Sequence, residues 1–348
     1  MMTKHKQRLF YLDWVRALAT IMIVITHFDN PYLTRRPPFP NSPFGIYLGD
    51  LGVSQFLIIS GAALMLTYGD QDRLDLKTFY WKRFKSIYPM FWLAFIIANA
   101  YLFIVNHGTV AARAPKRSLI LSLIGMDGYL TNAGLATFYT LGEWFLGFIV
   151  LYYLIFPILR YGVMRRPWLT AIIVLTLYAG TLTLHPQIGR MPENLLLTTR
   201  LPELVFGMYY IRYAKTVTHP VAIVCLIFLT IQQITSLAQG DVAVTLVGIA
   251  CFLTLVWISR WIDHRAVKIV VGSIAKYSYA IFLVHHQVIN QVYSAVLPDA
   301  VIGKLSAYLL FFTDMLIIAA LSICLQRLNT ATINYVSAMT GRSKSSAH

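Results

Sequence analysis

Charged residues are scarce in this sequence of 348 residues, since Lys, Arg, Asp and Glu make up only 12% of it. A soluble globular chain carries about 25% of these residues. Hydrophobic residues reach 57%, which is more apolar surface than a soluble core of this length buries. This composition excludes a disordered chain, a collagen-like chain and a cytosolic enzyme. It predicts a protein whose solvent is lipid.

Cysteine is also rare, with three residues, and acidic residues number 14 against 29 Lys and Arg. Cys225, Cys251 and Cys324 lie in apolar stretches without the spacing of a disulfide framework or a metal site. The formal net charge of +15 falls in short loops, and no long basic run is present. We therefore expect neither a nucleic acid partner nor a resident metal.

Ten apolar windows approach the roughly 20 residues that a helix needs to cross about 30 Å of hydrocarbon. They are 12–29, 46–67, 86–106, 138–160, 167–184, 199–213, 219–237, 241–259, 270–297 and 303–327. The more polar residues 107–137 are expected to form a re-entrant or surface segment. We predict an all-α polytopic membrane protein with one domain over 1–348, its core at about 10–330 and a cytoplasmic tail at 331–348.

The distribution of Lys and Arg predicts how the helices are oriented. With the N-terminus inside, the inner segments carry more than twice as many of these residues as the outer loops. Both termini are therefore expected to be cytoplasmic. The N-terminal apolar run holds Asp13 and Arg16 and lacks a small-residue cleavage site, which favours a retained first helix over a signal peptide.

Ionisable side chains within membrane spans are costly, so each one indicates a candidate functional site. Asp13 and Arg16 are three residues apart on one face of the first helix, where they can form an ion pair. His27 lies about 16 Å beyond Arg16 along the same face. This spacing aligns a cation near one end of the helix with an imidazole near the other. The alternative is an arginine and a histidine that simply reach the two membrane interfaces.

A basic segment, Lys82-Arg83-Phe84-Lys85, precedes the third span and faces the cytoplasm in this orientation. Lys82, Arg83 and Lys85 are candidates for binding the phosphates of a cytoplasmic ligand through charge-assisted hydrogen bonds. The alternative, which charge alone favours, is an anchor among anionic lipids.

Six segments of the chain stand in an order that is typical of a known family. They are Tyr11–Ala19 with His27, Phe56–Gly61, Arg83–Trp92, Trp144–Leu146 with Tyr153 and Pro157, Arg200–Glu203 with Gly207, and Tyr277–His286. Each is a weak pattern alone, but the ordered set resembles the acyltransferase type 3 family of integral-membrane acyltransferases over nearly the whole chain. Two departures stand out. Ser86, beside Lys85, replaces the second arginine of an Arg-x-x-Arg pattern, and Glu143 precedes Trp144 instead of following a Trp-Ser pair.

The resemblance implies a ten-helix core in a cell membrane, here a bacterial cytoplasmic membrane. It implies transfer of an acyl group, commonly acetyl, from cytoplasmic acyl-coenzyme A to a hydroxyl of an extracytoplasmic glycan or lipid-linked envelope component. Arg16 and the basic segment would serve the donor, and His27 would be the essential histidine. Coenzyme A carries phosphates at one end and a thioester at the end of a long arm, which suits this spacing. His27 would take the acceptor's proton or carry the acyl group itself.

Four further residues are weaker candidates for the site. Glu143 either orients His27 or acts as a base, or it is a helix-end carboxylate. His285 and His286 are adjacent on a helix and point about 100° apart, so we expect at most one to face a shared site. Ser60, next to Gly61, is expected to allow close helix packing, and as a nucleophile it would need a base.

Other functions remain open at this point. A secondary transporter or channel of envelope precursors also uses charges within spans and broken helices. A non-catalytic scaffold of an envelope assembly is a third option. Some members of the family carry an additional extracytoplasmic domain that completes the transfer. The chain ends soon after its last predicted span, so we expect either direct acylation of the acceptor or a separate extracytoplasmic transferase partner.

Overall fold

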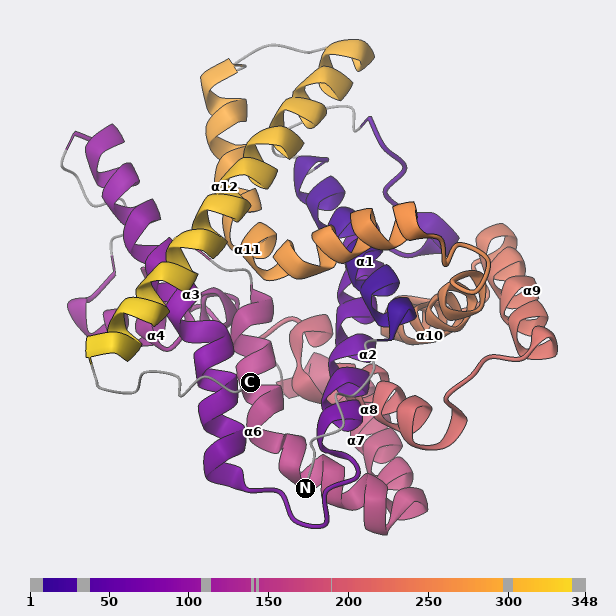
Figure 1. Ribbon diagram of the computed structural model, residues 1–348. Helices are drawn as coiled ribbons and strands as arrows, with labels where there is room; N and C mark the ends of the chain where they lie inside the picture. The colour runs from indigo at the N-terminus through magenta and orange to yellow at the C-terminus, as the bar shows by residue number, and fades with distance from the viewer. Residues whose placement is uncertain are drawn as a thin grey trace.

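The computed structural model describes residues 9–29, 38–107, 114–138, 141, 144–188, 190–296 and 303–339, and these residues form helices joined by loops, without a strand. Side chains at 186–188 and at 296 are not among those described. The long helices are α1 Phe10–Phe28, α2 Leu48–Tyr68, α3 Leu76–Val105, α6 Trp144–Arg165, α7 Pro167–Ile188, α8 Leu197–Tyr209, α9 His219–Thr235, α10 Gly240–Ile258, α11 Arg265–Val296 and α12 Lys304–Met339 (Figure 1). The prediction of an all-α polytopic membrane protein is confirmed.

Each of the ten predicted spans corresponds to one of these helices. Eight of them, all except α8 and α9, are long and apolar enough to cross a membrane. Helix α9 has 17 residues, and α8 has 13 before a π-helical turn at Tyr210–Ala214. Because α8 packs against α2, α6, α7 and α10, its backbone is enclosed by protein and need not match the thickness of the bilayer.

Helix α1 lies between α2 and α11, and this arrangement positions the site (Figure 1). Helix α11 follows α1 over its length. The Lys268 ammonium stands 6.0 Å from the centre of the Phe10 ring at one end, and His285 contacts His27 at the other. Both ends of α1 therefore contact side chains of α11.

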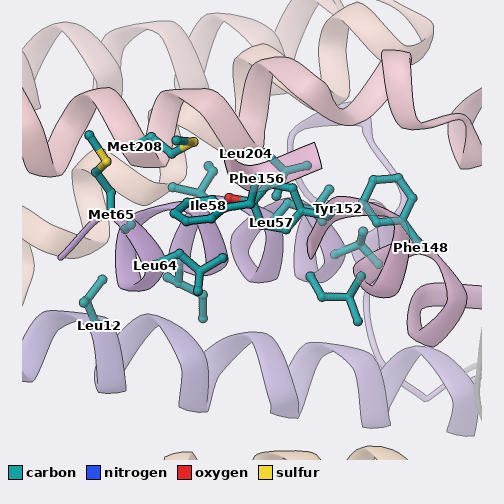
Figure 2. Packing of buried hydrophobic residues seen from close by; sticks show 14 of the residues in the cluster. Leu12, Leu57, Ile58, Leu64, Met65, Phe148, Tyr152, Phe156, Leu204 and Met208 are labelled. Carbon is teal, nitrogen blue, oxygen red and sulfur yellow. The ribbon is translucent and has the colours of Figure 1, made fainter. Parts of the chain in front are cut away.

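Helices α2 and α8 cross at two glycines. A Cβ atom on Gly61 would stand 1.9 Å from the Leu204 carbonyl oxygen, and one on Gly207 would stand 1.9 Å from the Ile58 carbonyl oxygen. The two backbones touch because neither helix has a side chain at the crossing, as is common between membrane helices. Figure 2 shows Ile58 and Met65 of α2 beside Leu204 and Met208 of α8 around this contact.

Replacing Gly207 with alanine should force α2 and α8 apart and lower the free energy of unfolding by about 1–3 kcal/mol, the usual cost of overpacking. The measurement is thermal unfolding of the detergent-solubilised protein. Gly180→Ala in α7 is the matched control, because no atom lies within 4 Å of the position of its added Cβ. Equal melting temperatures for the two variants would contradict the close crossing.

The segment between α3 and α6 contains two short helices in its described part, α4 Leu119–Leu123 and α5 Asp127–Thr131. It is tied to α3 by two hydrogen bonds. The Tyr88 hydroxyl donates to the Ile124 carbonyl at 2.9 Å, and the Trp92 indole donates to the Leu123 carbonyl at 2.8 Å. Neither helix is long enough to span a bilayer, as the polar composition of 107–137 predicted.

Candidate active site

His27 stands in the last turn of α1 and lines a cavity of about 190 Å³. Helices α1, α2, α6 and α11 and the residues Tyr47 and Asn194 form its walls. The aromatic side chains of the wall are Tyr47, Phe56, Trp144, Phe145 and Phe282. Asp50 also lines the wall, as an ionisable group in addition to His27 and Tyr47. An imidazole, a carboxylate and several aromatic rings thus surround one small space.

Two more histidines contact His27. The centre of its ring lies 4.9 Å from that of His285 and 5.2 Å from that of His286. Neither of them is among the residues that line the cavity, so the expectation that at most one would face a shared site stays a prediction. Their side chains leave α11 in different directions, but each is long enough to reach the ring of His27, which lies across both positions on the adjoining helix α1.

His285 is fully buried, and its Nδ1 atom lies 2.9 Å from the Phe282 carbonyl oxygen and 3.1 Å from that of Ile281. A carbonyl oxygen only accepts hydrogen bonds, so Nδ1 carries the proton in the neutral ring. The bonds to its own helix fix the orientation of the His285 ring. His285 thus contacts the His27 ring and is not among the residues that line the cavity.

A buried ion network lies behind the cavity wall. Arg200 of α8 is fully buried, and its guanidinium is 2.9 Å from Asp50 Oδ1, 3.4 Å from Glu203 Oε1 and 4.0 Å from Asp241 Oδ1. It also donates from Nε to the Asn194 carbonyl at 2.8 Å. Arg200 thus joins α2, α8 and α10 and connects with two residues of the cavity wall, Asp50 and Asn194.

Acidic groups dominate the electrostatics at this end of the bundle. Burial first, and then the carboxylates of Asp50 and Asp29, raise the pKa of the Tyr47 hydroxyl above its ordinary value. Burial also raises the pKa of Asp29, just beyond the end of α1, to about 6. Tyr47 therefore keeps its proton near neutral pH and offers a hydrogen-bond donor to the cavity.

Cationic groups gather near the other end of α1. The Arg83 guanidinium lies 5.6 Å from the centre of the Tyr153 ring and 5.9 Å from that of Tyr68, and its Nη2 is 3.5 Å from the Tyr68 hydroxyl. Arg16 is close enough to the Tyr153 hydroxyl for an electrostatic interaction. Among the described residues, no carboxylate forms an ion pair with Arg83. The structure thus brings Arg16 and Arg83 together around Tyr153.

The other predicted donor-binding residues have different surroundings. Lys82 and Lys85 are exposed, and the Lys85 ammonium stands 4.9 Å from the centre of the Trp81 ring. Arg83 is half-buried because its position on α3 faces the bundle, whereas the two lysines are on the outer face. Asp13 is buried beside Arg16, with 4.0 Å between Asp13 Oδ1 and Arg16 Nη1.

Aromatic rings connect the two ends of the site. Tyr279 of α11 lies near Tyr153 of α6, and it stacks on Phe282 with ring centres 6.2 Å apart. Phe282 in turn lies 6.2 Å from His285, which contacts His27. Aromatic side chains of α11 therefore extend from the neighbourhood of Tyr153 to the histidines.

Two remaining candidates, Ser60 and Glu143, lie outside the cavity wall or cannot be placed. The Ser60 hydroxyl donates to the Phe56 carbonyl of its own helix at 2.6 Å and does not line the cavity. Glu143 lies outside the described residues. Asp314 of α12 is buried, and neither of its carboxylate oxygens has a hydrogen-bond partner among the described residues.

Sequence reasoning did not find Asp50, Asp241 or Tyr47. Asp50 and Asp241 stand in the first turns of apolar helices, where a carboxylate is a common and unremarkable choice. The available signal was the position of Arg200 within an apolar window, because a buried arginine needs carboxylate partners.

Helices able to span a membrane, with a histidine cavity between them, define a polytopic membrane protein with an internal site. Residues 9–325 match the family described as Acyltransferase domain, so the chain belongs to this family of acyltransferases. The resemblance to the acyltransferase type 3 family, based on six ordered segments, is confirmed.

Individual relatives have low sequence identity to this chain. An acyltransferase of Streptomyces mycarofaciens is 28% identical over 119 residues, which cover 34% of this chain and 30% of the relative. Proteins of Staphylococcus aureus strains COL and N315, both named "Putative O-acetyltransferase", are 22% identical over 353 aligned residues, covering 89% of this chain and 55% of theirs. The chain thus spans about half the length of these curated relatives. No solved structure matches it.

Proposed function

We propose that this protein is a membrane-embedded O-acyltransferase of the bacterial cytoplasmic membrane. It takes an acyl group, acetyl in the first instance, from cytoplasmic acyl-coenzyme A. It transfers this group to a hydroxyl of an extracytoplasmic glycan or lipid-linked envelope component, directly or through a separate extracytoplasmic transferase. The positive-inside distribution supports an orientation with Arg16 and Arg83 toward the cytoplasm and His27 toward the opposite face.

The observation that supports this proposal best is the separation of charge along α1. Arg83 and Arg16 surround Tyr153 at one end, while His27 and Asp50 share a cavity at the other. Coenzyme A has the matching asymmetry, with phosphates at one end and a thioester at the end of its arm. An arm laid along Tyr279 and Phe282 would carry the thioester to His27.

Two reaction sequences fit this geometry. In the first, His27 removes the proton of the acceptor hydroxyl, the oxygen attacks the thioester carbonyl, and the carbon–sulfur bond breaks. The released thiolate then receives the proton from His27. In the second, a ring nitrogen of His27 attacks the thioester carbonyl, the carbon–sulfur bond breaks, and the thiolate takes the N–H proton of the acylated ring. The acceptor hydroxyl then attacks the acyl carbon, the nitrogen–acyl bond breaks, and the ring takes up the acceptor's proton. Both sequences yield the ester and free coenzyme A.

Donor binding tests the proposal before the acceptor is known. The purified protein should bind acetyl-coenzyme A saturably in titration calorimetry, and Arg83→Ala should weaken binding about tenfold or more, since one charge-assisted contact is lost. The phosphate-free analogue acetyl-pantetheine should be affected little by the same substitution. Equal losses for both ligands would assign Arg83 to folding.

Lys85→Ala is the matched control, because it removes a positive charge from the same segment but from the exposed face beside Trp81. It should change the affinity for acetyl-coenzyme A by less than about twofold. If folded protein binds no acyl-coenzyme A, the enzyme proposal fails and transport of envelope precursors becomes the leading alternative.

A further inference from the structure

The wall of the histidine cavity contains an acidic group that the proposed chemistry leaves without a role. Asp50 lines the cavity together with aromatic side chains of α6 and α11, and 23% of its side chain is exposed. The other members of its ion network are more enclosed. Arg200 and Glu203 have no exposed side-chain surface, and Asp241 has 12%.

Arg200 fixes the orientation of the Asp50 carboxylate. Its Nη2 atom donates to Asp50 Oδ1 at 2.9 Å, while its Nε atom is held by the Asn194 carbonyl. An ionised carboxylate has two oxygens and accepts about four hydrogen bonds. The Asp50 carboxylate is therefore fixed by Arg200 and can still accept hydrogen bonds from a ligand in the cavity.

The network also gives the cavity a negative wall. Three carboxyl groups share the single cation Arg200, and Asp50 is the one of them that lines the cavity. The raised pKa of the nearby Tyr47 hydroxyl, to which Asp50 and Asp29 contribute, is consistent with a negative charge on this wall. An anionic group entering the cavity would be repelled, whereas a neutral hydroxyl would find an acceptor.

We infer that Asp50, positioned by Arg200, binds a hydroxyl of the acceptor beside His27 and restricts the cavity to uncharged, hydroxyl-bearing rings. The ring faces of Trp144 and Phe145 provide the apolar surface against which such a ring packs. Phosphorylated or carboxylated groups of the acceptor remain outside the cavity. This inference rests on the proposed acyltransferase function, because it concerns the second substrate of the same site.

The test compares two sugars that differ only at one carbon, methyl glucoside and methyl glucuronide, as acceptors with acetyl-coenzyme A. Release of free coenzyme A is followed with a thiol reagent, and the acylated sugar is identified by mass spectrometry. Wild-type protein should acylate the neutral sugar at least about tenfold faster than the anionic one. Asp50→Asn should raise KM for methyl glucoside about tenfold and narrow the preference for it, because one charge-assisted hydrogen bond and one negative charge are lost.

Two further variants separate binding from folding. Asp241→Asn removes a carboxylate that contacts Arg200 but does not line the cavity. It should leave KM for methyl glucoside near the wild-type value and should narrow the preference between the two sugars less than Asp50→Asn does. Asp50→Glu retains the ion pair and the charge. Unlike Asp50→Asn, it should therefore keep the wild-type preference for methyl glucoside, even if its KM differs.

Each outcome decides between the proposals. Wild-type protein that binds acetyl-coenzyme A but acylates the anionic sugar equally well, or acylates neither sugar, overturns this inference and leaves the donor site intact. Asp50→Asn with unchanged KM and unchanged preference overturns it as well. Failure to bind acetyl-coenzyme A at all instead removes the proposed function.

Discussion

His27→Ala should lower the rate of acyl transfer about 10³-fold or more, within the range that general acid–base groups contribute. In both reaction sequences the His27 ring handles the proton or the acyl group, and an alanine methyl group does neither. Donor binding should persist, because Arg16 and Arg83 lie toward the other end of α1. The measurement pairs coenzyme A release with calorimetry of acetyl-coenzyme A on the same preparation.

A histidine outside the cavity provides the matched control. His219 of α9 accepts a hydrogen bond from the Trp257 indole at 3.2 Å and belongs to no part of the proposed site. His219→Ala should retain transfer within about twofold. A His27→Ala protein that turns over normally would remove this residue from the mechanism and direct attention to His286.

Arg200→Leu should lower the free energy of unfolding by about 3–5 kcal/mol, the cost of removing one partner from a buried ion pair. Asp50, Glu203 and Asp241 would then lie close together without a cation, and each is enclosed by the bundle. The leucine restores apolar volume but not the charge. Thermal unfolding in detergent, followed by intrinsic fluorescence, measures the loss.

An exposed ion pair supplies the comparison for this variant. Arg212 stands 3.9 Å from Asp70, with 40% and 77% of the two side chains exposed. Arg212→Leu should cost less than about 1 kcal/mol, because surface pairs are screened by water. Adding Glu203→Gln to Arg200→Leu should recover part of the lost stability, since it removes one unpaired charge. An Arg200→Leu protein that melts like wild type would contradict the network.

Arg83 and Arg200 lie near opposite ends of α1, and substituting them should have different effects. Arg83 has no carboxylate partner among the described residues, so its removal should affect ligand binding more than folding. Arg200 is fully paired, so its removal should affect folding first. An arginine already neutralised by protein carboxylates has little attraction left for a phosphate.

The sequence by itself determined the elements and their broad role. Long apolar windows require helices in lipid, because a helix satisfies its own backbone hydrogen bonds, and this located all ten long helices. The helical repeat also related Arg16 to His27, since both belong to one rigid element. The order of the six signatures was enough to identify the family.

Only the tertiary structure decided which side chains meet. Asp50 and Arg200 are 150 residues apart in the chain and pair because α2 and α8 cross at Gly61 and Gly207. Their contact depends on the rotation of each helix about its axis, which periodicity within one helix does not specify. The rotation of α3 about its own axis likewise turns Arg83 toward the bundle and Lys85 away from it. Helix packing thus converted a list of ionisable residues into a cationic end, an acidic cavity and a line of rings between them.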